Sequence, residues 1–416
     1  MRKTLDRRGF LGAGAAATAG IATLASRAHG EPFQSGPRQA GPSQAQDNTY
    51  KILKSIKEFE KESYVDSSSE NKGADTANYE VKVDCSLGTN PLGYSPTLSD
   101  AIASISKVDI NSYPAFPYND FKKDIAESWK DAASLTADNI LVHTGSMGVL
   151  ELINKAFIQS GSKELGYTPQ FSDYVSDVRS LGGVYDSYKL DHAANMKFDA
   201  DALIRKITPE FSLIYMDNPN NPTGQITPLE DIERIVKAAD AKGVCVIVDE
   251  AYGDFMDRAN SGINLIGKYK NVIATRSFSK GFGLAGLRIG YLISSVELTA
   301  MFNKINLPFA VSNYAAYLAP TVLKDQEFVE YSKTGIKDRK RKIMAAKTRL
   351  QFMHTSETVP IFFARHPDEN VHLYTELLKH GIKTEDGVNF ENAGQNYARV
   401  RTPKEIDYLL EVFARI

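Results

Sequence analysis

Residues 277–291 read SFSKGFGLAGLRIGY, which places Lys280 among hydroxyl residues and glycines, with Arg288 eight residues further on. A lysine amine used for covalent chemistry must be partly neutral near pH 7 and must stay accessible. Serine hydroxyls and a guanidinium suit a phosphate group, and glycines let backbone approach it. The residues of these types are Ser277, Ser279, Arg288, Gly281, Gly283 and Gly286. The stretch indicates a lysine beside a bound phosphate, although a surface Ser/Gly loop with two ordinary cations is the plainer alternative.

The length and composition are those of a soluble enzyme with two domains. The chain has 416 residues, which is more than one hydrophobic core usually supports. The residues are 42% hydrophobic and 24% charged, and the formal net charge is -2. This balance offers no electrostatic attraction to nucleic acid or to an anionic membrane, so neither is expected as a partner.

The first 28 residues are expected to be an export signal. The basic opening MRKTLDRRGF leads into the apolar, Gly/Ala-rich run LGAGAAATAGIATLA and then into a small-residue cleavage site at 26–28. The run is too short and too weakly hydrophobic to stay in a bilayer. Arg7 and Arg8 resemble a twin-arginine signal, with Asp6 where Ser or Thr is usual. We therefore expect twin-arginine export to the periplasm, without stable membrane association after cleavage, or a cytoplasmic protein if the arginine pair is coincidental.

The remaining boundaries follow from composition. Residues 29–49 are rich in Pro, Gly, Gln and Ser and are expected to form a flexible linker. Residues 50–89 are assigned to an N-terminal arm and part of a small domain, 90–300 to a large domain, and 301–416 to the small C-terminal domain. The two cysteines, Cys85 and Cys245, argue against a disulfide framework.

Apolar strands alternate with amphipathic helices between about residues 140 and 290, which predicts a largely parallel sheet with helices on both faces. Ligands bind at the carboxyl ends of the strands in such folds. The groups that carry chemistry all follow strands: Gly145, Ser146 and Met147 at a helix start, Asn221, Asp249 with Tyr252, and Ser277 to Lys280. A glycine turn at a helix start is an anion site by its free N–H groups and dipole.

Asp249 ends the apolar run VCVIV, where a carboxylate is costly unless it is paired. The protonated ring nitrogen of pyridoxal phosphate is a suitable partner, and a helix N-cap or a salt bridge is the ordinary alternative. Asn221 and Tyr252 are placed to hydrogen-bond the phenolic oxygen of that ring. The loop NPNNPTG, residues 218–224, would however form a tight turn in any protein.

The ordered set NPNNPTG, DEAY and SFSKGFGLAGLRIGY resembles the fold type I pyridoxal phosphate enzymes of the class I/II aminotransferases. The resemblance runs from about residue 84 to 402 and is greatest to the histidinol-phosphate aminotransferase branch. It implies an α/β fold with a large domain on a mainly parallel, seven-stranded sheet and a smaller α/β domain. It also implies pyridoxal 5'-phosphate as cofactor, no metal, amino acid and 2-oxo acid substrates, and a homodimer.

The resemblance also implies residue roles. Lys280 would form the Schiff base with the cofactor, Asp249 would bind the pyridine nitrogen, and Asn221 and Tyr252 would contact O3′. The further cofactor contacts would be Gly145, Ser146, Met147, Phe171 at the stacking position, Ser277, Ser279, Arg288, and Tyr113, which in this family reaches the phosphate of the neighbouring subunit. Arg399 of NYARVRTP would hold the substrate carboxylate, with Arg401 as the alternative two residues on and Asn90 also on the substrate side.

One position departs from that branch. Glu385 of HGIKTEDG stands where the branch has an arginine for the substrate phosphate. Because a carboxylate repels a phosphate, we expect a substrate with a neutral or cationic side chain.

Transamination is the expected reaction. A pyridoxal phosphate-dependent decarboxylase or lyase on the same scaffold is the alternative. A non-catalytic, cofactor-binding regulatory module is more distant, because Lys280 is present and no helix-turn-helix pattern precedes residue 84.

Overall fold

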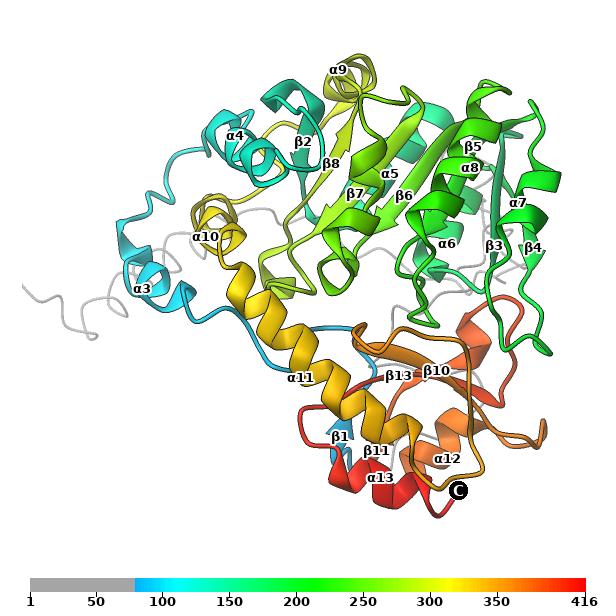
Figure 1. The fold of residues 1–416 in the computed structure, drawn as a ribbon. Helices are drawn as coiled ribbons and strands as arrows, with labels where there is room; N and C mark the ends of the chain where they lie inside the picture. The colour runs from blue at the N-terminus through cyan, green and yellow to red at the C-terminus, as the bar shows by residue number, and fades with distance from the viewer. Residues whose placement is uncertain (1–78) are drawn as a thin grey trace, which may run out of the picture. The chain divides into compact units, whose positions relative to one another are not determined.

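The computed structural model describes residues 79–416. The expected export signal, the linker and most of the expected N-terminal arm lie outside these residues. The described part contains a seven-stranded, a four-stranded and a two-stranded sheet (Figure 1). None of its helices is long and apolar enough to cross a membrane.

The seven-stranded sheet is mixed, with one strand reversed. Its order is β2 (Ile140–His143), β8 (Gly290–Ser294), β7 (Val272–Ser277), β6 (Cys245–Glu250), β5 (Phe211–Asp217), β3 (Lys163–Thr168) and β4 (Val184–Lys189). Strand β8 runs antiparallel to both neighbours, whereas β7, β6, β5, β3 and β4 pair in parallel. Parallel neighbours need a long crossover, usually a helix, and residues 278–289 contain only the short turn η6 (Ala285–Leu287). The predicted, mainly parallel sheet is confirmed.

The two faces of this sheet are covered by different helices. Helices α4 (Asn119–Ser128), α7 (Ala200–Lys206), α8 (Leu229–Asp240) and α10 (Asn313–Leu323) share one core, and α5 (Gly145–Phe157), α6 (Ser172–Ser180) and α9 (Val296–Ile305) share the other. Alternation along a strand assigns the side chains, so Ile214 of β5 enters the first core and Leu213 the second. With both faces covered, all residues of β7 are buried.

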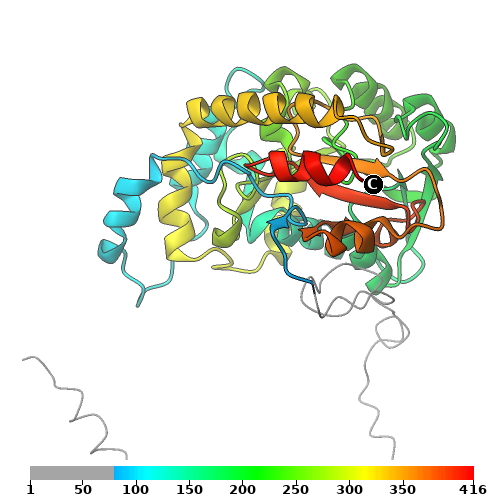
Figure 2. The same ribbon diagram turned by 90° about the horizontal axis from the view of Figure 1, so that it is seen from below.

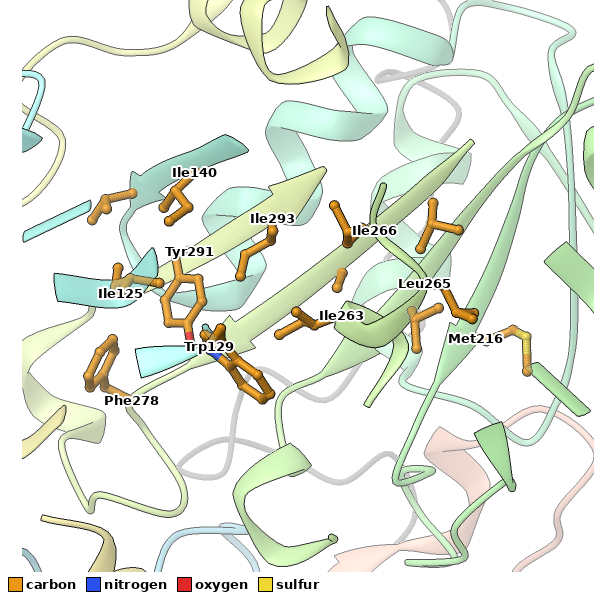
Figure 3. Packing of buried hydrophobic residues seen from close by; sticks show 14 of the residues in the cluster. Ile125, Trp129, Ile140, Met216, Ile263, Leu265, Ile266, Phe278, Tyr291 and Ile293 are labelled. Carbon is orange, nitrogen blue, oxygen red and sulfur yellow. Dashed lines mark hydrogen bonds between the residues drawn. The ribbon is translucent and has the colours of Figure 1, made fainter. Parts of the chain in front are cut away.

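The segment that contains Lys280 is anchored in the first of these cores (Figure 3). Phe278 is buried, and its ring centroid lies 5.3 Å from that of Phe282 and 5.8 Å from that of Tyr291. Tyr291 in turn accepts a hydrogen bond from the Trp129 indole N–H at 3.1 Å. Phe278 therefore fixes in the core the segment that carries Ser277, Ser279 and Lys280.

A third core, separate from the two on the large sheet, is built mostly from the C-terminal part of the chain. Strands β12 (Glu385–Asp386), β13 (Tyr397–Arg401), β10 (Ile361–Arg365) and β9 (Gln351–Phe352) form the antiparallel four-stranded sheet. Strand β1 (Val83–Asp84) pairs in parallel with β11 (Ile382–Lys383), and Cys85 is buried in the same core. Helices α12 (Leu373–Lys379) and α13 (Asp407–Phe413) also contribute to it.

Helix α11 (Gln326–Met344) connects the first core of the large sheet to this third core. Val329 packs in the core of the large sheet, and Ile343 packs in the core of the smaller sheet. In Figures 1 and 2 this long helix, drawn in gold, runs from the end of α10 toward the smaller sheet. The core of the large sheet thus continues past residue 300, through α10 to Val329. The short helix α3 (Leu98–Ala103) packs against α10.

Candidate active site

The start of α5 offers a place for an anion. Gly145, its first residue, has φ 71°, and the preceding Thr144 makes no side-chain capping hydrogen bond. A Cβ at Gly145 would lie 2.6 Å from Nη2 of Arg288, so only glycine lets the guanidinium lie over the helix start. Exposed N–H groups, the helix dipole and a guanidinium together favour a phosphate. Ser146 and Met147, which follow Gly145, are half-buried.

The end of β7 faces this helix start. Ser277 is its last residue, and its Oγ accepts a hydrogen bond from the Ser279 N–H at 3.0 Å. Arg288 donates to Ser279 Oγ at 3.4 Å and to the carbonyl of Ala285 at 3.1 Å. The hydroxyl of Ser279 and the guanidinium of Arg288 are thus held beside Gly145, as the sequence predicted for a phosphate site.

Lys280 has an amine suited to nucleophilic chemistry. Burial, followed by the positive charges of Arg399 and Arg288, lowers the pKa of Lys280 to about 7, while the carboxylate of Asp249 opposes the decrease. Nζ lies 5.2 Å from the centroid of the Tyr252 ring. A large share of the amines is therefore neutral near pH 7.

Asp249 presents a buried carboxylate at the end of β6. It accepts hydrogen bonds from Thr275 Oγ1 at 2.7 Å, Tyr215 OH at 2.9 Å and the Ala251 N–H at 3.2 Å. Burial raises the pKa of Asp249, and these hydrogen bonds oppose the rise. Within residues 79–416 no cation lies within 4.0 Å of it. Sequence reasoning missed Tyr215 and Thr275, although Thr275 is the register partner of Asp249 in β7.

Asp217 shapes the NPNNPTG loop, and sequence reasoning missed it although it ends β5 at the same edge of the sheet. It accepts hydrogen bonds from the Asn221 N–H at 2.9 Å, Asn220 Nδ2 at 3.0 Å and the Phe171 N–H at 3.3 Å. Burial raises the pKa of Asp217 to about 6. Its contacts orient Asn221, whose Oδ1 accepts from Arg399 Nη1 at 2.9 Å.

Arg399 reaches this loop from the smaller sheet. It is buried in β13, and Nη2 donates to the carbonyl of Ser86 at 2.5 Å. Glu385 is its register partner in β12, and the Oε2–Nη2 distance is 3.6 Å. The Nε atom of Arg399 has no partner among the described residues. Arg399 contacts Asn221, whereas Arg401, two residues further on, donates to the carbonyl of Asp84.

Two predicted site residues make other contacts. Asn90 is buried, and its Nδ2 donates to the carbonyl of Gly281 and to Ser332 Oγ, each at 2.9 Å. Tyr113 is 80% exposed, and its ring stacks on Phe309 with centroids 4.7 Å apart.

Similarity to known proteins shows which family the chain belongs to. The sequence pattern of the aminotransferase class I and II family matches residues 82–413. The chain belongs to this family. The aminotransferase is 30% identical over 307 residues to the histidinol-phosphate aminotransferase of Ruminiclostridium cellulolyticum, covering 73% of this chain and 83% of that protein. It is 32% identical over 333 residues to that of Methanococcoides burtonii, covering 79% and 88%.

Solved structures agree on the fold. The aminotransferase superimposes on the histidinol-phosphate aminotransferase of Clostridium acetobutylicum with a TM-score of 0.71 and 25% identity, covering 80% of this chain and 98% of that one. The Sinorhizobium meliloti enzyme in complex with pyridoxal-5'-phosphate gives 0.70 and 24%, covering 81% and 90%. The predicted fold, enzyme class and cofactor are confirmed: the chain is a pyridoxal phosphate-dependent aminotransferase with a fold type I architecture.

The residues of the aminotransferase fit this cofactor. A Cβ at Gly145 would fill the space beside Arg288 at the helix start, which is where a phosphate is favoured. Asp249 is a buried carboxylate with hydrogen bonds but no ion pair in the described part of the chain, which suits a protonated ring nitrogen. Lys280 carries a buried amine whose pKa responds to both Arg288 and Asp249.

Proposed function

We propose that this aminotransferase moves an amino group from an unphosphorylated amino acid, or a similar primary amine, to a 2-oxo acid, with Lys280 as its catalytic residue. The buried amine of Lys280 carries this proposal, because Arg399, Arg288 and Asp249 all act on its pKa and Nζ lies 5.2 Å from the centroid of the Tyr252 ring. Burial and two neighbouring cations keep its amine available as a base at neutral pH.

The other residues of the site have separate tasks. The start of α5 with Ser277, Ser279 and Arg288 would hold the cofactor phosphate, Asp249 the ring nitrogen, and Asn221 with Tyr252 the ring oxygen, with Phe171 against the ring. When bound, pyridoxal phosphate withdraws electrons from a bond at the Cα of the attached amine. Arg399 binds the substrate carboxylate and thereby selects the Cα–H bond for cleavage. Nζ of Lys280 would take the proton from Cα and deliver it to the C4′ carbon of the cofactor, which leaves Cα at the oxidation level of the 2-oxo acid.

A half-reaction screen tests the assignment. Amino acids are added one at a time to the purified holoenzyme, and the cofactor absorbance is followed, with the oxo acid and carbon dioxide measured separately. Lys280→Ala should remove both the visible band of the wild type and its turnover. A variant that keeps both would refute the role of Lys280, and carbon dioxide without oxo acid would indicate decarboxylation instead.

We infer that Glu385 selects against phosphorylated substrates. It is buried beside Arg399, its Oε1 accepts from Asn389 Nδ2 at 2.8 Å, and burial raises its pKa while Arg399 opposes the rise. A phosphate placed near this carboxylate would be repelled. Glu385→Gln should raise the relative turnover of phosphorylated amino alcohols, with the exposed Glu357→Gln as control. Turnover by the wild type of phosphorylated amino alcohols, and not of ordinary amino acids, would contradict this inference.

We also propose a homodimer in which Tyr113 completes the site of the second copy. Its ring stacks on Phe309, which is 41% exposed, and the nearby chain positions Ile110 and Leu307 are 71% and 63% exposed. Exposed apolar side chains of this kind mark interfaces. Sedimentation measures the oligomeric state. Mixing Tyr113→Ala with Lys280→Ala subunits should restore activity that neither has alone, because one intact site forms per mixed dimer. A monomer, or no restoration, would contradict the proposal.

Export to the periplasm by the twin-arginine route is proposed from the sequence alone. Arg7→Lys with Arg8→Lys keeps the charge and should leave the protein in the cytoplasm, as measured by cell fractionation. Equal export of both forms would exclude that route.

A further inference from the structure

Two buried side chains hold the peptide groups of Gly281, the residue directly after Lys280. Nδ2 of Asn90 donates to the Gly281 carbonyl at 2.9 Å, and the carboxylate of Asp254 accepts from the Gly281 N–H. A Cβ at Gly281 would collide with the side chain of Asp254, so the close approach depends on glycine. The backbone beside the proposed catalytic lysine is thus held by side chains from two other segments.

Asp254 is itself firmly held. It lies in the short turn η3 (Gly253–Phe255) and forms a buried ion pair with Arg276 of β7. The guanidinium of Arg276 also pairs with Glu250 at 3.0 Å and lies 5.0 Å from the centroid of the Trp129 ring. These contacts connect the Gly281 N–H to the ends of β6 and β7 in the large sheet.

Asn90 approaches Gly281 from a distant part of the chain. Its Oδ1 accepts from the Leu92 N–H at 2.9 Å, which fixes the orientation of the amide. Its Nδ2 also donates to Ser332 Oγ at 2.9 Å, and Ser332 lies in α11. Helix α11 packs in the first core of the large sheet and in the core of the smaller sheet. Asn90 therefore connects the backbone beside Lys280 to the helix that joins these two cores.

We propose that Asn90 and Asp254 are positioning residues that place Nζ of Lys280 by fixing the peptide groups on either side of Gly281. This inference rests on the proposed role of Lys280. A lysine side chain is long and flexible, so the location of its amine depends on a fixed backbone at its base. A displacement of about 1 Å in a reacting group can lower the rate of a reaction on the order of 100-fold. In this role Asn90 acts through the Gly281 carbonyl and not through the substrate. The sequence, in contrast, predicts a position on the substrate side for Asn90.

The two roles for Asn90 predict different kinetics in the holoenzyme. With Asn90→Ala, a positioning role predicts that the single-turnover rate with a reactive amino acid falls by roughly 10- to 100-fold. The dissociation constant of the 2-methyl analogue of that amino acid, which has no Cα proton to lose, should change less than about twofold. The pH midpoint of the cofactor absorbance band should also move. Asp254→Asn, which removes the ion pair with Arg276, should change the same quantities in the same way.

Asn271→Ala is the matched control. Asn271 is equally buried, its Nδ2 donates to the carbonyls of Val236 and Val244 at 3.2 and 2.9 Å, and it precedes β7 at the opposite end of the strand from Ser277. The Asn271→Ala substitution should lower thermal stability and leave the single-turnover rate and the pH midpoint of the absorbance band unchanged. If Asn90→Ala does not fold, Asn90→Ser, which keeps one hydroxyl donor, is used for the same comparison.

The outcomes are distinct. Weaker binding of the 2-methyl analogue with an unchanged single-turnover rate would assign Asn90 to the substrate and overturn the inference. Loss of stability alone, as in Asn271→Ala, would reduce its role to folding and also overturn it. A wild-type enzyme that reacts with no amino acid would overturn the proposed function itself, together with this inference.

Discussion

The reactivity of Lys280 in the cofactor-free protein should rise through a midpoint near pH 7. Its pKa is lowered to about 7 from the ordinary value of 10.5, chiefly by burial and then by Arg399 and Arg288. At pH 7 roughly half of the amines are neutral, whereas at a pKa of 10.5 about one in 3000 would be. Only the neutral amine reacts as a nucleophile, so the local environment supplies a factor on the order of 1000.

The assay is amine modification across a pH series. Cofactor-free protein is treated briefly with an amine-reactive reagent at each pH, and the peptide containing Lys280 is quantified by mass spectrometry against the other lysine peptides of the digest. Arg399→Gln should raise the midpoint, because it removes the positive charge that disfavours the ammonium most strongly. A midpoint near 10 in the wild type, or a midpoint that falls in Arg399→Gln, would refute the electrostatic account.

Further predictions concern the surroundings of the site. Gly145→Ala should weaken cofactor binding about tenfold or more, measured by absorbance titration, because a Cβ meets Arg288 at a positive φ. Tyr215→Phe should shift the acid limb of the pH–rate profile to higher pH, because Asp249 loses a hydrogen bond that opposes its raised pKa. Lys340→Met should lower the free energy of unfolding by about 3 kcal/mol in urea titrations, because the carbonyls of Ser356, Val359 and Ile361 lose their buried hydrogen-bond donor.

Several of the candidate site residues could be proposed from the sequence because they lie at or near strand ends. Asp249 is the penultimate residue of β6 and Ser277 is the last residue of the neighbouring β7, and parallel strands bring their carboxyl ends to one edge of the sheet. A run of apolar residues followed by a polar residue can be recognised in the sequence without knowledge of distant contacts. The hydrogen-bond partners of those groups were harder to see. Tyr215 faces Asp249 only because β5 and β6 pair in a particular register, and that register is set by packing on both faces of the sheet.

By itself the sequence determined the class of chemistry: a lysine next to phosphate-binding groups, a carboxylate at a strand end, and their order along an α/β chain. Tertiary structure decided which groups meet across long separations. It placed Arg399 against Asn221 and Glu385, and Asn90 against Gly281 and Ser332. Such contacts leave no local periodicity, because they depend on how the smaller sheet and α11 pack against the loops of the large sheet.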